Sequence, residues 1–101
     1  MQNMHSKRVR IVNPMGLHAR PAGRFVAVAG RFDARVRVAC NGEEVDGESI
    51  LSLLMLEAVR GTELHLQTSG PEAEEALTAL VTLIDGGFEE PDSVNGRGAR
   101  G

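Results

Sequence analysis

Hydrophobic positions along this chain follow two different periods. In residues 7–13, 34–40 and 63–68 they alternate with polar positions, which is the pattern of strands that have one buried and one wet face. In residues 20–30 and 73–84 they recur every third or fourth position, as in a helix that lays one stripe on a core. The chain therefore predicts strands and amphipathic helices in mixed order.

Turn signals complete the middle of the chain. Asn41-Gly42 is a strong two-residue hairpin signal, and it predicts a short return strand over residues 43–46. A second helix is expected over residues 50–59, with Asp46 or Ser49 as its cap. This helix is apolar nearly all round, so it is either deeply buried or presents one face to another protein.

Residues 69–72 have the S-x-x-E form of a capping box, which predicts the start of the third helix, and Gly86-Gly87 predicts its end. The resulting order is β-α-β-β-α-β-α. It predicts an α+β fold in which a four-stranded antiparallel sheet carries three helices on one face. The pattern alone also permits a ferredoxin-like split βαβ arrangement.

The chain is long enough for one domain. We expect a flexible lead over residues 1–6, a folded domain over residues 7–90 and a disordered tail over residues 91–101, which is poor in apolar residues. We expect the domain to be a monomer.

Composition narrows the function classes. With three Phe and no Trp or Tyr, the core must be aliphatic, and no aromatic platform exists for stacking nucleic-acid bases. No apolar run is long enough to span a membrane, and the polar N-terminus lacks the apolar core of a signal peptide, so a cytoplasmic location is expected. Cys40 is the only cysteine, and His5, His18 and His65 lack metal-ligand spacing, so no metal is expected.

The strongest chemical signal is His18, directly before a helix that Pro21 favours at its first turn. The first turn of a helix has free N–H groups and the positive end of the dipole, so it favours anions. The same end suits a neutral imidazole, which is the nucleophilic form. Arg20 can bind phosphate through two parallel hydrogen bonds. His18 is therefore a candidate phosphoryl acceptor, and Arg20 is its candidate charge partner.

Residues 16–22 resemble the active-site motif of HPr, the histidine phosphocarrier of the bacterial sugar phosphotransferase system, and of its nitrogen-related paralogue NPr. Residues 41–42, 46–53 and 60–64 fall at the spacing of the same family. The resemblance covers residues 7–90. It implies the open-faced β-sandwich of that family, which decides against the ferredoxin-like alternative.

The resemblance also implies a site. In it, Nδ1 of His18 is phosphorylated, the backbone N–H groups of Ala19 and Arg20 surround the phosphate with the Arg20 side chain, and Gly16 lets the backbone turn tightly beneath the ring. The implied partners are Enzyme I as donor and an Enzyme IIA domain as acceptor, with no cofactor. Typical members stop close to the third helix, whereas this chain continues, so no terminal carboxylate is expected at the site.

The second helix raises two further expectations. Ser49 matches the position at which many HPr proteins are phosphorylated by HPr kinase, but Glu48 replaces the usual basic residue before it, and Asp46 adds a second acidic neighbour. We also expect an exposed apolar patch that docks partners near His18. Its members are Leu17, Leu51, Leu54 and Met55.

Two alternatives remain open. An NPr-like protein, or one controlled by HPr kinase, would signal its phosphorylation state without feeding sugar transport. An anion-binding interaction domain would bind partners through the second helix with no phosphorylation at all. The sequence does not identify the sugar or the regulatory target downstream.

Overall fold

A computed structural model describes residues 4–90. The predicted disordered tail over residues 91–101 lies outside the described residues. The described elements follow the predicted order and end in a short 3-10 turn. They are β1 (Met4–Arg10), α1 (Ala19–Ala29), β2 (Arg35–Cys40), β3 (Glu43–Asp46), α2 (Ile50–Leu54), β4 (Glu63–Ser69), α3 (Ala73–Asp85) and η1 (Gly87–Glu89).

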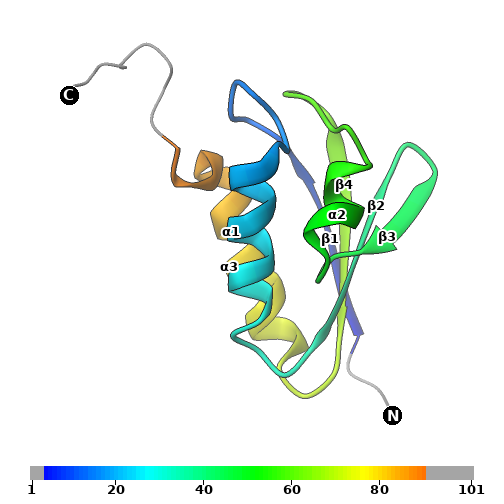
Figure 1. Cartoon of the computed structure of the whole chain (residues 1–101). Coiled ribbons are helices and arrows are strands. Elements are labelled where there is room, and N and C mark those ends of the chain that lie inside the picture. The colour runs from blue at the N-terminus through cyan, green and yellow to red at the C-terminus, as the bar shows by residue number, and fades with distance from the viewer. Residues whose placement is uncertain (1–3, 91–101) are drawn as a thin grey trace.

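The strands form one sheet in the order β1-β4-β2-β3 (Figure 1). All three pairings are antiparallel, with Leu66 of β4 opposite Lys7 of β1 on one side and Val38 of β2 on the other. This arrangement confirms the α+β open-faced sandwich. Neighbouring strands of a ferredoxin-like sheet are antiparallel as well, so the direction of pairing does not decide between the two folds. The ferredoxin-like order would be β4-β1-β3-β2, and the observed order β1-β4-β2-β3 shows that this alternative is wrong.

The core lies between the sheet and the helices. Alternation places Val36 and Val38 of β2 and Leu64 and Leu66 of β4 on the covered face, where all four are buried. The helices α1 and α3 lie side by side over this face (Figure 1), and α2 packs against α1. The apolar side chains that recur every third or fourth position along α3 face the core. Four of them are buried and two, Leu77 and Val81, are partly buried; the buried ones are Ala73, Ala76, Leu80 and Ile84.

The first strand begins earlier than expected. Residues Met4, His5 and Ser6 belong to β1, where Met4 pairs with Ser69 and His5 with Thr68. The prediction that residues 1–6 form a flexible lead is therefore wrong for these three. The reason is that β4 extends to Ser69 and offers free backbone groups along the whole length of β1.

The second helix is shorter than expected. Helix α2 ends at Leu54, and Glu57 adopts a left-handed backbone with a φ of 51°. The N–H groups of Leu56 and Glu57 bond three residues back, which tightens the last turn. The Ala58 carbonyl then accepts the N–H of Leu17 at 2.9 Å. The predicted continuation to residue 59 is wrong because this backbone instead binds the loop before α1.

The predicted capping box at the third helix is also wrong. Ser69 is the last residue of β4, and Glu72 precedes α3 without capping it through its side chain. Instead, Oε1 of Glu72 accepts the backbone N–H of Asp33 at 2.7 Å, and the N–H of Glu72 bonds the carbonyl of Asp33. A tertiary contact with the loop before β2 has replaced the local one.

Candidate phosphoryl-acceptor site

The loop between β1 and α1 is held by backbone bonds. The N–H of Gly16 bonds the carbonyl of Asn13 at 3.2 Å, and the N–H of His18 bonds the carbonyl of Gly16 at 3.0 Å. Gly16 has a φ of 73°, and a Cβ there would lie only 2.5 Å from the Ala58 carbonyl oxygen. A glycine is thus required both by the backbone angle and by the close approach of a second chain segment.

His18 occupies the N-cap position of α1. Its backbone is extended, its carbonyl accepts the N–H of Ala22 at 2.9 Å, and its side chain makes no capping hydrogen bond. The N–H groups of Ala19 and Arg20 precede this first helical bond, so they belong to the donors that a helix start leaves unsatisfied. The half-exposed imidazole of His18 is therefore carried by the residue that directly precedes these free amides.

Arg20 is exposed on the first turn of α1. The structure thus places three of the predicted site residues, His18, Ala19 and Arg20, consecutively at one helix start, and the carbonyl of Gly16 accepts the N–H of His18. The backbone amides and the arginine can all supply positive potential to an anion at this position.

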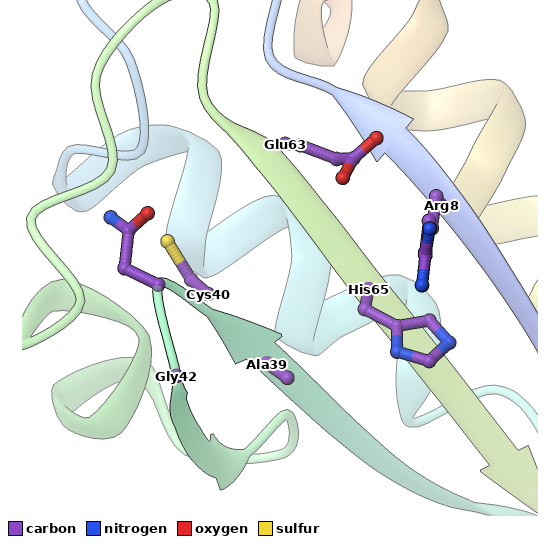
Figure 2. A pocket seen from close by; sticks show the side chains of 7 residues that line it. Arg8, Ala39, Cys40, Gly42, Glu63 and His65 are labelled. Atoms are coloured by element: carbon purple, nitrogen blue, oxygen red, sulfur yellow. The ribbon is translucent and has the colours of Figure 1, made fainter.

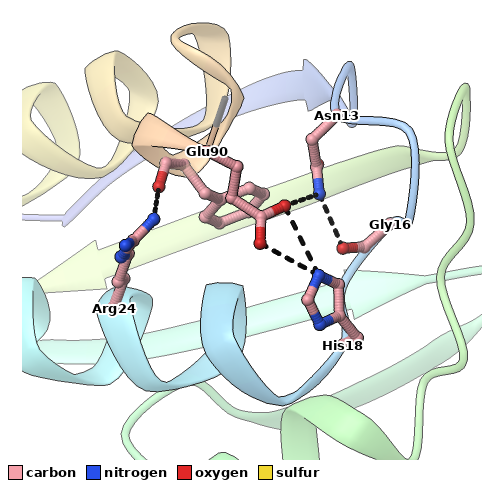
Figure 3. A network of polar contacts seen from close by, with 6 residues as sticks. Asn13, Gly16, His18, Arg24 and Glu90 are labelled. Atoms are coloured by element: carbon pink, nitrogen blue, oxygen red, sulfur yellow. Dashed lines mark hydrogen bonds and ion pairs between the residues drawn. The ribbon is translucent and has the colours of Figure 1, made fainter. Parts of the chain in front are cut away.

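A carboxylate that the sequence did not predict also belongs to this site. Oε2 of Glu90 lies 3.0 Å from Nε2 of His18, and Oε1 lies 3.4 Å from the same nitrogen (Figure 3). Nδ2 of Asn13 donates to Oε1 of Glu90 at 3.0 Å and to the Gly16 carbonyl at 2.8 Å. We did not expect a terminal carboxylate at this site, and the carboxylate found here belongs to a side chain.

Glu90 is fixed by the turn that precedes it. Phe88 of η1 is fully buried, and its carbonyl accepts Nη1 of Arg24 at 2.6 Å (Figure 3). The backbone of Phe88 and Glu89 is left-handed, with φ values of 59° and 63°. Neither the periodicity of hydrophobic residues nor the charge pattern predicts such a turn. In the sequence, the one local indication of it was an isolated Phe88 after two glycines.

The expected exposed patch is confirmed only in part. Leu51 and Met55 are 69% and 66% exposed, and Leu54 is partly buried against the core. Leu17 is 4% exposed, so its predicted place on the surface is wrong. Its N–H bond to Ala58 holds it between the two loops, with its side chain in the core.

Ser49, one of the two residues predicted to cap the second helix, is the N-cap of α2. Its Oγ accepts the N–H of Ser52 at 3.2 Å, while the carboxylate of Asp46 accepts the N–H of Glu48 at 2.8 Å. Ser49 is partly buried. The hydroxyl therefore has a structural role that needs no modification.

A Ser49→Ala variant tests that role. Loss of the cap should lower the free energy of unfolding by about 1 kcal/mol, measured by urea denaturation. Ser52→Ala is the matched control, because it keeps the N–H that Ser49 accepts, and it should change stability by less than about 0.5 kcal/mol. Equal effects in the two variants would show that the cap contributes nothing.

The remaining histidine and cysteine side chains lie elsewhere. His65 is on the open face of the sheet beside Arg8 and Glu63, in a shallow hollow of about 270 Å³ that Cys40 also lines (Figure 2). Burial, with a smaller contribution from Glu43, raises the pKa of the Cys40 thiol, which keeps it protonated.

Within residues 4–90, no cluster of three or more His, Cys, Asp or Glu could hold a metal ion. Over the same residues, no helix is long and apolar enough to cross a bilayer.

Comparison with known families decides what kind of protein carries this site. The family described as the PTS HPr component phosphorylation site matches residues 5–86, which is most of the chain. The chain belongs to the HPr family. Its sequence resemblance is thereby confirmed, and so is its membership among the phosphocarriers of the phosphotransferase system.

Individual members of the HPr family align over nearly their whole length. Phosphocarrier protein HPr of Pseudomonas aeruginosa is 51% identical over 88 residues, which are 86% of this chain and 98% of that protein. Phosphocarrier protein NPr of Escherichia coli is 39% identical over 83 residues, covering 81% and 92%. The crystal structure of an HPr from Thermoanaerobacter tengcongensis matches with a TM-score of 0.82 at 36% identity, covering 86% of this chain and 98% of that one.

Proposed function

We propose that this HPr-family chain accepts a phosphoryl group on Nδ1 of His18 from phosphorylated Enzyme I and passes it to an Enzyme IIA domain. The observation that carries the proposal is the His18 ring, which stands at the start of α1 with no capping bond of its own. A phosphoryl group on this ring would face free backbone amides and the positive end of the helix dipole. The resulting P–N bond is labile, so the group remains transferable.

Arg20 supports the same role. Its guanidinium is exposed two residues after His18, on the first turn of the helix. In our proposal it swings over the phosphoryl oxygens and binds them with two parallel hydrogen bonds. Because the transferring group carries its charge on those oxygens, fixed positive groups stabilise it during arrival and departure.

The test is a two-step transfer. The chain is incubated with phosphoenolpyruvate and Enzyme I, and an Enzyme IIA domain is then added. We expect label that depends on Enzyme I, is lost in acid and is stable in base, followed by its movement to the IIA domain. A chain that takes no label from active Enzyme I would contradict the proposal and favour a plain anion-binding domain.

The apolar surface of α2 is the proposed docking site for these partners. Leu51 lies on α2 and Met55 directly follows it, and both are exposed. Helix α2 packs against α1, which begins directly after His18. Methionine suits a surface that must fit several partners because its side chain is flexible. The proposal places a monomer in the cytoplasm, where Enzyme I and IIA domains exchange phosphoryl groups.

A Met55→Glu variant tests this docking surface. Placing a charge at the centre of an apolar interface should weaken binding to Enzyme I by about 10–100-fold, measured by calorimetry. Met4→Glu is the matched control, since Met4 is 68% exposed but lies at the opposite end of β1 from the His18 loop. Equal weakening by both variants would contradict a specific surface on α2.

A regulatory role is the second candidate, since the chain also aligns with NPr of Escherichia coli, at 39% identity over 81% of its length. In that case His18 would still be charged by an Enzyme I, but the acceptor would control regulators rather than transport. Incubation of the charged chain with sugar-type and nitrogen-type IIA domains separates the two, because only the physiological acceptor is expected to take the group rapidly. Control through HPr kinase at Ser49 is disfavoured by the acidic neighbours Asp46 and Glu48.

A further inference from the structure

The carboxylate of Glu90 contacts only one of the two ring nitrogens of His18. Oε2 lies 3.0 Å and Oε1 lies 3.4 Å from Nε2, and neither contact is to Nδ1 (Figure 3). An ionised carboxylate only accepts hydrogen bonds, so it is satisfied by an Nε2–H and not by an Nε2 lone pair. In a neutral imidazole, a proton held on Nε2 leaves the lone pair on Nδ1.

The surroundings hold this carboxylate in place rather than merely allowing the contact. Nδ2 of Asn13 donates to Oε1 of Glu90, and Asn13 is itself buried and tied to the Gly16 carbonyl. The Glu90 side chain is only 14% exposed. The backbone before Glu90 is fixed by buried Phe88, whose carbonyl accepts a hydrogen bond from Arg24. The carboxylate is therefore already ordered in the folded chain and loses little conformational freedom when it contacts the ring.

Within the described polar network, no other side chain accepts a hydrogen bond from the ring. Both protons of the Asn13 amide nitrogen are already directed at the Gly16 carbonyl and at Glu90. Arg24 bonds the backbone of Phe88, and it carries donors only. Oδ1 of Asn13 is a further acceptor in this network, but it makes no hydrogen bond to the ring or to any other described group. Among the described residues, Glu90 is thus the side chain whose acceptor atoms contact a ring nitrogen of His18.

We propose that Glu90 is a positioning residue that selects the Nε2–H tautomer of His18 and thereby presents Nδ1 as the nucleophile. The inference rests on the proposed function, because it concerns which nitrogen takes the phosphoryl group. It adds a residue outside the motif around His18, supplied by the segment that follows α3.

The transfer step then needs no proton to leave the site. The Nδ1 lone pair forms the P–N bond while the bond from phosphorus to the donor nitrogen of an N-phosphorylated partner breaks, and its electron pair returns to the donor. The proton on Nε2 stays where it is. The ring gains positive charge, and the carboxylate of Glu90 lies against the N–H that carries much of it.

A Glu90→Gln variant tests the inference before any phosphorylation. Glutamine keeps the size of the side chain but has both a donor and an acceptor, so it satisfies either tautomer. At about pH 8.5, where imidazole is neutral, ¹⁵N NMR gives the ratio of the Nε2–H to the Nδ1–H form. We expect this ratio to fall by about five- to tenfold in the variant, of the order of one charge-assisted hydrogen bond at a part-exposed site.

Glu89→Gln is the matched control, because it removes the same charge from an exposed neighbour, and its ratio should equal that of the unaltered chain. A ratio unchanged in Glu90→Gln, or lowered equally in both variants, would overturn the inference. The labelling experiment is read separately. If Enzyme I fails to charge the unaltered chain, the proposed function fails, while the tautomer ratio still decides the role of Glu90.

Discussion

Replacing His18 by alanine is expected to reduce Enzyme I-dependent labelling of this chain to background. The variant removes the only nucleophile that we propose for the reaction, and neighbouring donors cannot replace it because amides and guanidinium groups carry no available lone pair. The fold should survive, because the His18 side chain is 40% exposed and does not cap α1. The measurement is the stoichiometry of acid-labile label after incubation with phosphoenolpyruvate and Enzyme I.

His65→Ala is the control for this experiment. His65 lies on the open face of the sheet, beside Arg8 and Glu63 (Figure 2), and its loss should leave the labelling unchanged. Label retained by His18→Ala, or lost equally in His65→Ala, would contradict the assignment of the acceptor.

A Gly16→Ala variant is expected to lose about 3 kcal/mol of stability. The new Cβ would lie 2.5 Å from the Ala58 carbonyl oxygen and 2.9 Å from Cα of Val59, and both are backbone atoms that cannot rotate away. Moving them would strain the bond between Leu17 and Ala58 and displace the loop that carries His18. For a domain of this size, the melting temperature should fall by more than about 10 °C, measured by circular dichroism.

Gly42→Ala separates the cost of the left-handed backbone from the cost of the clash with Ala58 and Val59. Gly42 also has a left-handed backbone, with a φ of 84°, but nothing lies within 4 Å of a Cβ built there. Its substitution should cost only the strain of that backbone, about 1 kcal/mol. Equal losses at both glycines would show that the contact between the two loops contributes nothing.

Much of this fold could be predicted because the alternation of apolar and polar residues along a strand shows which of its faces is buried. The alternation in β2 and β4 specified which residues face the helices, and Asn41-Gly42 placed the hairpin between β2 and β3. The errors fall where tertiary contacts replaced local ones. Glu72 bonds the loop at Asp33 instead of capping α3.

The site shows the same division. A local run placed His18 and Arg20 at a helix start, because the rules for helix starts act over a few residues. Glu90 was missed because it comes 72 positions after His18 and arrives through a turn with a left-handed backbone at Phe88. Leu17 was misplaced because its burial depends on the loop at Ala58, which approaches only once Gly16 allows it. Long-range approaches of this kind leave no period in the sequence.

The central claim is that Nδ1 of His18 receives the phosphoryl group, and one measurement tests it most directly. The chain is labelled with ¹⁵N, charged by Enzyme I and phosphoenolpyruvate, and examined for one-bond coupling between phosphorus and a ring nitrogen. We predict a single coupling, to Nδ1 of His18. Coupling to Nε2 of His18 or to another histidine, or phosphorus bound to a serine oxygen, would contradict the account.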